Sequence, residues 1–279
     1  ARLLKLPADQ FGQALSIASS SASGMKLQFG TETKVVHEGL AAQAGMQAAY
    51  LAQQGITSQI HFFDSRDGFK DLYGDHQSKC LNGLKETILG RAVLDYPVIR
   101  KPWPSCAYTH RIIEAAEKIH DPSLQMEDID EVIIEIPDPW TKVVKFQIPN
   151  NEAEARFSAP YCVMMALQSG SLGPDDFSNQ IYLTEERQKL TKRATVQAFK
   201  VDSQFKEMSP DYPDMVSVKL KNGSMIKESI GYVKGGFHNP MSLEDLRNKF
   251  QKCSNKSTFF DQFLSAPIEA NSSSLLDIF

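Results

Sequence analysis

The first hundred residues carry small and apolar side chains at helical spacing. Residues 11–22 place Leu15, Ala18 and Ala22 on one face, which predicts a helix that ends near Gly24. A second predicted helix, about 39–54, repeats small residues every three or four positions: Ala41, Gly45, Ala48, Ala49 and Ala52. Small residues at such steps let helix backbones approach closely, so we expect these helices to be buried among others.

The pattern changes after a run of prolines, Pro97, Pro102 and Pro104, which break any helix. Strand-like alternation then appears between helical segments. Together with a short helix over 81–89, the pattern predicts a helix over 109–119, a strand over 131–136, a helix over 151–170, a short strand within 191–201, a hairpin over 215–230, a helix over 242–252 and a last short helix within 261–279. The fold class is therefore a mostly helical part joined to an α+β part.

Two of these elements have local signals of their own. Asn222-Gly223 stands between the two halves of the hairpin and predicts a type I′ turn. The helix over 242–252 opens with Ser242 and has Asp245 three positions later, which resembles a capping box.

Composition and charge argue against several classes of function. The 279 residues carry a formal net charge of −4, and the basic residues form no stripe, which argues against a nucleic-acid partner. No apolar run approaches the roughly 20 residues that cross a bilayer, so no membrane role and a cytoplasmic location are expected. The four cysteines, Cys80, Cys106, Cys162 and Cys253, form no CxxC pair, which argues against a zinc or iron–sulfur site.

The densest chemical signal lies between Thr31 and Gly45. Lys34 and His37 precede a predicted helix whose free N–H groups begin near Gly39. A cation and an imidazole beside the positive end of a helix dipole would hold a carboxylate. The alternative interpretation is a solvated loop lysine and a capping histidine.

A second signal follows the prolines, where a stiffened turn precedes a helix and presents hydroxyls, a thiol and an imidazole: Ser105, Cys106, Tyr108, Thr109 and His110. Such a turn suits anion binding or proton transfer. The alternative is a purely structural turn, in which the prolines end the preceding segment, Thr109 is an N-cap and Cys106 is a small buried apolar residue.

A third signal is Arg156, which either pairs with Glu152 or Glu154 along a helix or clamps a substrate carboxylate. The pair Gly235-Gly236 is expected to serve backbone conformation, with His238 beside it as a hinge-region side chain.

Five segments in this order resemble the MmgE/PrpD family: residues 14–24, 33–45, 101–106 with Thr109-His110, 154–158 and 239–242. The resemblance implies a helical domain built from both ends of the full chain, with the N-terminal half of that domain absent here, and an inserted α+β lid. The expected boundaries are 1–95 for the first part of the helical domain, 96–237 for the lid and 238–279 for the last part of the helical domain.

The resemblance also implies a carboxylate site that needs no metal and no cofactor. Lys34 falls on the family's active-site lysine and His37 belongs to the same motif. Cys106 falls where decarboxylase-type members carry a histidine. We therefore expect Lys34, His37 and Cys106 to be catalytic, and Ser105, Tyr108, Thr109, His110 and Arg156 to bind substrate.

The expected activity is that of a lyase, a dehydratase or isomerase, acting on a di- or tricarboxylic acid such as 2-methylcitrate. Decarboxylation of cis-aconitate and epimerisation stay open. One alternative is a catalytically incomplete fragment or a subunit of a split enzyme. Another is a thiol hydrolase using Cys106 and His110. The expected partners are a small carboxylic acid and either a second copy of the chain or a companion chain that supplies the other helical half.

Overall fold

The computed structural model describes residues 1–74, 98–202, 205, 208–254, 260–261 and 264. The chain divides into two compact units, 1–96 and 97–279, and each is described by itself. The helices expected over 81–89 and within 261–279 fall wholly or largely outside the described residues, as does Cys80.

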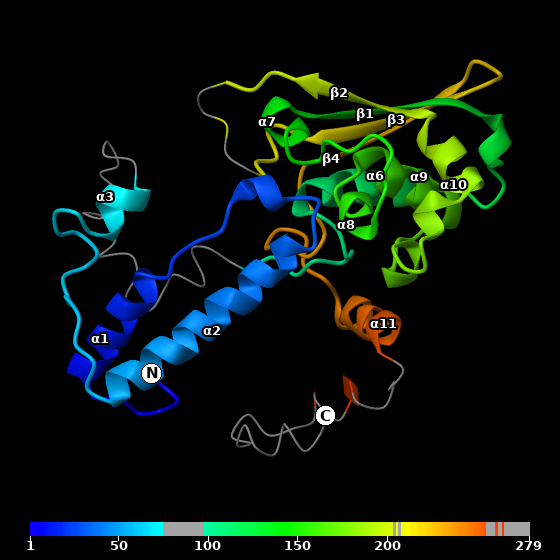
Figure 1. Cartoon of the computed structure of the whole chain (residues 1–279). Helices are drawn as coiled ribbons and strands as arrows, with labels where there is room; N and C mark the ends of the chain where they lie inside the picture. Colours follow the sequence, from blue (N-terminus) through cyan, green and yellow to red (C-terminus); the bar gives the residue numbers. More distant parts are fainter. Residues whose placement is uncertain (75–97, 203–204, 206–207, 255–259, 262–263, 265–279) are drawn as a thin grey trace. The chain divides into compact units, whose positions relative to one another are not determined.

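The first unit is helical (Figure 1). α1 (Ala8–Ser19) packs along α2 (Thr33–Gln53), with a 3₁₀ turn, η1 (Lys26–Gln28), between them. The short helix α3 (Phe69–Tyr73) follows a segment rich in aromatic residues, in which Phe63 stacks on Phe69 with ring centroids 5.7 Å apart. Both predicted helices are therefore present in the unit.

Only part of the predicted buried surface is buried. Ala48, Ala49 and Ala52 of α2 are at most 4 % exposed, as the spacing predicted, but Ala41 and Gly45 are exposed. On α1 the predicted face is wrong, because Leu15 is 51 % exposed and the neighbouring Ala14 is buried. The buried residues of α1 are Ala14 and Ser16, which lie on either side of Leu15, so apolar spacing alone did not select the buried face.

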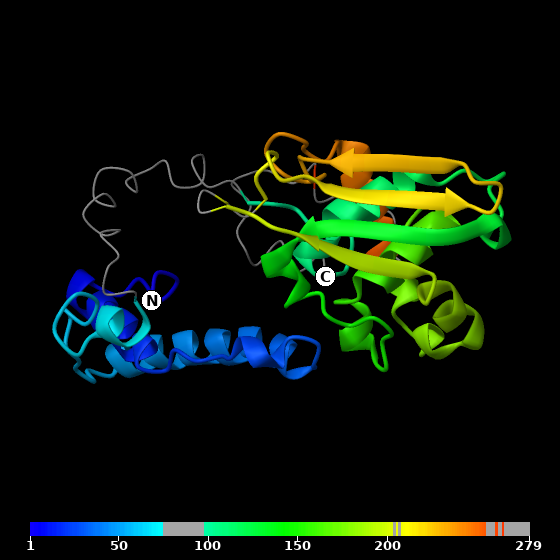
Figure 2. The ribbon, with the colours of Figure 1, turned by 90° about the horizontal axis from the view of Figure 1, so that it is seen from above.

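The second unit contains a four-stranded sheet in the order β2-β1-β3-β4, seen from above in Figure 2. Its strands are β1 (Ile129–Pro137), β2 (Ala194–Phe199), β3 (Asp214–Leu220) and β4 (Met225–Ile230). β1 pairs with β2 in parallel and with β3 antiparallel, and β3 pairs antiparallel with β4. The alternation of Val132, Ile134 and Ile136 predicted β1, and all three side chains are fully buried.

Helices cover one face of this sheet (Figure 1). α6 (His110–Ile119) contacts β3 and β4, whereas α9 (Ala159–Ser169) contacts β2 and α6. The other elements of this part are short: η2 (Ala107–Thr109), η3 (Met126–Asp128), α7 (Asp138–Thr141), α8 (Glu152–Ala155), η4 (Pro174–Asp176), η5 (Ile181–Leu183) and α10 (Glu185–Thr191). Helix and strand segments thus form the predicted α+β architecture.

The helix expected over 151–170 is two helices, α8 and α9, and the prediction of one continuous helix is wrong. Pro160 occupies the first turn of α9 and has no N–H to continue a helix from α8. The Ser158 side chain accepts a hydrogen bond from the Tyr161 N–H at 3.2 Å and caps the second helix.

The hairpin has a different turn from the one predicted. A type I′ turn needs positive φ at both central residues, but only Gly223 (φ 87°) has it and Asn222 does not. The Gly223 N–H donates to the Leu220 carbonyl, and the Leu220 N–H donates to the Ser224 carbonyl, both at 2.9 Å. This is a three-residue loop with a left-handed glycine at its end.

Gly235 gives the first prediction, because it combines a left-handed φ of 88° with close packing. Its carbonyl accepts from the Arg100 N–H at 3.0 Å, and a Cβ on Gly235 would clash with the Arg100 carbonyl oxygen. We expect Gly235→Ala to destabilise the second unit by more than the about 1–2 kcal/mol that the backbone conformation alone costs. Urea unfolding followed by circular dichroism measures the difference.

Gly223→Ala is the matched control. Gly223 has a φ of 87°, but a Cβ added there would meet nothing within 4 Å, so its substitution carries the conformational cost alone. Equal losses in the two variants would contradict the role of Gly235 in this close contact.

α11 (Leu243–Cys253) confirms the predicted capping box. Ser242 accepts from the Asp245 N–H at 3.0 Å, and the Asp245 carboxylate accepts from the Ser242 N–H at 2.9 Å. In the division into two units α11 belongs to the second one, while its assignment to a helical domain stays a prediction.

Candidate functional site

Lys34 and His37 lie inside α2, not before it. The helix begins at Thr33, and the Val35 N–H already bonds to the Glu32 carbonyl at 2.9 Å. The prediction of a helix start near Gly39 is therefore wrong. β-Branched residues lower helix propensity only slightly, so Val35 and Val36 are compatible with an earlier start. Lys34 lies in the first turn, where the N-terminal end of the helix dipole acts, and His37 lies in the turn that follows.

The Lys34 ammonium lies on the surface of the first unit beside one carboxylate. Its Nζ is 2.7 Å from Oε1 of Glu38 and 5.9 Å from the centre of the Phe29 ring, and the side chain is 35 % exposed. The hydrogen bond from Lys34 lowers the pKa of Glu38. The site can thus hold a carboxylate, and Glu38 fills that role in this structure.

His37 packs against the loop that follows α1. A Cβ at Gly24 would lie 3.3 Å from His37 Nδ1, so the absence of a side chain at Gly24 makes room for the imidazole. The structure thereby brings together two of the segments singled out in the sequence, 14–24 and 33–45. Sequence spacing alone did not show this contact.

The second group of candidates surrounds the start of α6 in the second unit. Oγ of Ser105 and Oγ1 of Thr109 are 2.8 Å apart, and the Thr109 hydroxyl donates to the Cys106 carbonyl at 2.8 Å. Ser105 and Thr109 are buried, whereas Cys106 is half-buried. The hydroxyls hold the turn in place and leave the Cys106 side chain as the accessible group among these three.

Tyr108 and His110 are fixed by aromatic neighbours. Tyr108 stacks on Trp140 with ring centroids 4.7 Å apart, and His110 meets Trp103 edge-on at 5.3 Å. His110 is 1 % exposed, and burial lowers its pKa to about 3, so its imidazole is neutral at physiological pH. Nε2 of His110 has no hydrogen-bond partner among the described residues. Substrate binding by these two residues stays a prediction.

Arg156 ties the same turn to α8. Its guanidinium donates to the Pro104 carbonyl, contacts Glu152 at 2.6 Å and lies 4.7 Å from the centre of the Phe177 ring. The Cys106 N–H donates to the Arg156 carbonyl at 2.9 Å. The structural pair with Glu152 expected from the sequence is present, and a substrate clamp stays a prediction.

Lys101 is a cation that sequence patterns did not single out. Its Nζ donates to the Ser105 carbonyl at 3.1 Å, so it lies beside the predicted substrate-binding turn. The signal available in the sequence was a lysine directly before the Pro-Trp-Pro turn.

The cysteines give the second prediction. Cys253 is exposed, Cys106 is half-buried, and Cys162 is fully buried with a pKa raised by burial. Since the thiolate is the reactive form, iodoacetamide should label Cys253 first, Cys106 more slowly and Cys162 only after unfolding. Peptide mass spectrometry with and without urea measures this order, and labelling of native Cys162 as fast as Cys106 would contradict it.

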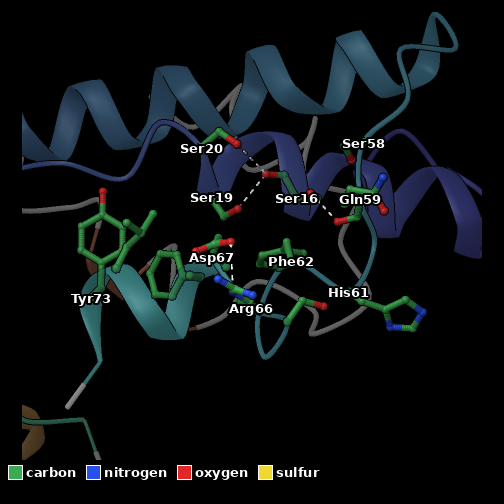
Figure 3. A pocket seen from close by; sticks show the side chains of 14 residues that line it. Ser16, Ser19, Ser20, Ser58, Gln59, His61, Phe62, Arg66, Asp67 and Tyr73 are labelled. Atoms are coloured by element: carbon green, nitrogen blue, oxygen red, sulfur yellow. Dashed lines mark hydrogen bonds and ion pairs between the residues drawn. The ribbon is translucent and has the colours of Figure 1, made fainter. Parts of the chain in front are cut away.

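A cavity of about 550 Å³ lies in the first unit between α1 and the segment that leads to α3 (Figure 3). Hydroxyl groups line it, but Ser16 donates to the Gln59 carbonyl at 2.8 Å and Ser19 to the Ser16 carbonyl at 2.7 Å. Arg66 lies 3.7 Å from Asp67 at its rim. Its polar groups are largely used within the protein, so the cavity offers no clear ligand chemistry.

Metal-binding clusters and membrane-spanning helices are both absent from the part of the chain that the structure describes. Within it no group of three or more histidine, cysteine, aspartate or glutamate side chains is placed to hold a metal ion. Of the helices described there, none has both the length and the apolar character that a membrane crossing requires.

Comparison with known proteins gives matches along most of the chain. The model of the MmgE/PrpD N-terminal domain matches residues 1–81, and that of the MmgE/PrpD C-terminal domain matches residues 103–262. The cis-aconitate decarboxylase of Mus musculus is 28 % identical over 270 residues, which cover 91 % of this chain and 52 % of the mouse protein. That of Homo sapiens is 28 % identical over 269 residues, covering 93 % and 54 %.

The chain thus spans about half the length of the curated relatives it matches. The C-terminal domain model alone accounts for more than half of the chain. The segments that carried the resemblance in the sequence lie within the two matched ranges, apart from residues 101–102. The chain belongs to the MmgE/PrpD family.

Proposed function

We propose that the protein is a lyase that acts on a small di- or tricarboxylic acid and needs no metal ion. The observation that carries this proposal is the match to both domain models of the MmgE/PrpD family, together with two relatives that are cis-aconitate decarboxylases. Dehydration or isomerisation of such an acid begins with the removal of a proton α to a carboxylate, which needs a base and a cationic environment for the developing charge. Decarboxylation needs a cationic environment as well, because negative charge develops when carbon dioxide leaves, and it needs an acid that then protonates the carbon.

Lys34 supplies the cation in this proposal. Its ion pair with Glu38 lies at the surface and joins residues four positions apart on one helix, and solvent screening keeps such pairs weak. A substrate carboxylate therefore displaces the Glu38 carboxylate at little cost. His37, one turn into the same helix, is the candidate for proton transfer beside it.

The first candidate reaction is dehydration of an acid such as 2-methylcitrate, in which a C–H and a C–O bond break and water leaves. The second is decarboxylation of cis-aconitate, in which a C–C bond breaks, carbon dioxide leaves and a proton is added to carbon. The relatives' activity favours decarboxylation. Cys106, at the position where decarboxylase-type members carry histidine, favours dehydration or isomerisation.

Proton NMR in D₂O tests the function and separates the two reactions. The purified chain is incubated with 2-methylcitrate, citrate, cis-aconitate and aspartate-derived acids, and carbon dioxide release is followed in parallel. We expect loss of water or carbon dioxide, or exchange of an α proton for deuterium, with at least one acid. No turnover and no exchange with any of them would contradict the proposal for this chain.

We further propose that the active form is a homodimer or a complex with a companion helical chain. Large apolar side chains of α2 support this, since Val35, Val36 and Met46 are each more than half exposed. Light scattering after size-exclusion chromatography measures the mass. A monomer that is fully active would contradict this part of the proposal. A cytoplasmic location stays a prediction.

A further inference from the structure

A small cavity in the second unit combines an apolar floor with a rim of lysines. It has a volume of about 240 Å³ and lies between the Pro-Trp-Pro turn, the segment 172–174 and the end of α11. Pro102, Trp103 and Leu172 form part of its floor. Lys101, Lys249 and Lys252 also line it, and we call it the lysine-rimmed cavity.

The floor is rigid. Trp103 is 4 % exposed and Leu172 is 2 % exposed. The Trp103 indole N–H donates to Oε1 of Glu117 at 2.6 Å, and the ring meets His110 edge-on. A ligand would therefore contact a preformed apolar surface, and its binding would lose little free energy to the ordering of these side chains.

The rim is positively charged. Among the described residues that line the cavity there is no carboxylate. Lys249 and Lys252 are three positions apart on α11 and so lie on one face of that helix, which its capping box and the 2.6 Å ion pair between Lys234 and Asp245 hold in place. The ammonium groups of Lys101 and Lys249 both help to lower the pKa of His110, so their fields reach the same part of the protein.

The acidic groups nearby are engaged elsewhere. Glu117 and Asp245 line an adjoining hollow that Lys249 and Lys252 also border, and the charge of Lys252 acts on Glu117 there. Glu117 accepts the Trp103 hydrogen bond, however, and Asp245 is bound to Lys234, so neither carboxylate lines the lysine-rimmed cavity itself. Within the described residues Lys249 and Lys252 have no ion-pair partner of their own. An anion with an apolar part would fit this cavity, because its charge would pair with the lysines and its apolar part would cover the floor.

We propose that the lysine-rimmed cavity binds a small carboxylate with an apolar chain. The apolar chain lies on Trp103 and Leu172, and the carboxylate is held by Lys249 and Lys252 with Lys101 opposite. The cavity is smaller than the about 300 Å³ at which drug-sized sites begin, which limits the ligand to a few carbon atoms. The proposal goes beyond the lyase activity, because it uses neither Lys34 nor His37 and is tested without turnover.

Cys253 offers a direct test, because its exposed thiol lines the cavity. The rate at which iodoacetamide labels Cys253 in the full chain is measured by mass spectrometry against rising hexanoate at constant ionic strength. Hexanol and potassium chloride are the comparison additions. We expect hexanoate to slow the labelling in a saturable way, and hexanol and chloride at the same concentrations to have little effect.

Matched variants identify the groups that bind. Lys249→Gln with Lys252→Gln should weaken the protection by hexanoate about tenfold, since two charge contacts are lost. Lys249→Arg with Lys252→Arg should keep the protection and shows that loss of charge, and not misfolding, is responsible. Lys189→Gln with Lys192→Gln removes two lysines at the same spacing outside the cavity and should leave the protection unchanged.

Three results would overturn the proposal. They are no protection by hexanoate, equal protection by hexanol, and protection that survives the Lys249→Gln and Lys252→Gln changes. The first result would show that hexanoate does not bind the cavity. The second would show that the cavity binds apolar groups without regard to charge, and the third would show that the carboxylate binds elsewhere.

Discussion

Replacing Lys34 with alanine is expected to lower kcat/KM for the substrate by about 10²–10³-fold, the range found when one group that stabilises developing negative charge is removed. Lys34 is a half-buried cation in the first turn of α2, and its only ion-pair partner among the described residues is Glu38. The measurement is the initial rate by proton NMR with the acid that the wild-type chain turns over.

The fold should survive this change. The Lys34–Glu38 pair lies at the surface, where solvent screens it, so it contributes little to the stability of the fold. The unfolding transition of Lys34→Ala should therefore coincide with that of the wild type. A loss of activity that follows a loss of structure would argue against a catalytic role.

Two further variants separate charge from position. Lys34→Arg keeps the charge and should retain part of the activity, because guanidinium also binds carboxylates. Glu38→Gln removes the carboxylate that occupies Lys34 and should leave kcat intact while lowering KM. An unchanged rate in Lys34→Ala, or a large loss in Glu38→Gln, would show that Lys34 does not bind the reacting carboxylate.

Local signals in the sequence predicted much of the fold. Alternating Val132, Ile134 and Ile136 predicted β1, and Ser242 with Asp245 predicted the start of α11, since both depend on neighbours in the chain. Errors arose where the spacing of apolar residues was given more weight than other local signals. α2 begins six residues before Gly39, and the helix expected over 151–170 is interrupted at Ser158, although the Ser158 cap and Pro160 are themselves local signals.

The candidate site was harder to predict, because its contacts join distant positions. Arg156 reaches the Pro104 carbonyl, and Gly24 makes room for His37; neither contact has a signature in spacing. Lys101 was missed because a lysine next to proline carries no chemical pattern of its own until Ser105 lies beside it. The types of residue could be predicted from the sequence, but their packing required the structure.

Replacing Arg111 with methionine is expected to lower the free energy of unfolding by about 3–5 kcal/mol at pH 7, the cost of leaving a buried charge without its partner. Arg111 and Asp214 are each at most 1 % exposed, and Nη1 of Arg111 lies 3.8 Å from Oδ1 of Asp214. The guanidinium also donates to the carbonyls of Tyr212 at 3.0 Å and Ser209 at 3.1 Å. Urea unfolding followed by circular dichroism measures the loss.

The control variants separate the charge from the hydrogen bonds. Arg193 also donates to backbone carbonyls, those of Met126 at 2.6 Å and Ile129 at 3.3 Å, but has no buried carboxylate beside it in the described chain. Arg193→Met should therefore cost only about 1–2 kcal/mol. Adding Asp214→Asn to Arg111→Met should restore part of the lost stability, because it removes the unpaired charge.

The stability deficit of Arg111→Met is expected to depend on pH, because Asp214 can be protonated. Burial raises the pKa of Asp214 well above its usual value, and Arg111 opposes that rise. A carboxyl whose pKa is raised on folding adds stability that is fully present below its unfolded pKa and is lost as the pH rises through its folded pKa. Without Arg111 the pKa of Asp214 rises further, so the deficit of Arg111→Met should shrink between pH 7 and pH 4. A small deficit that does not change with pH would mean that Asp214 is already protonated in the wild type, and Arg111 would then hold the carbonyls of Ser209 and Tyr212 rather than a charge.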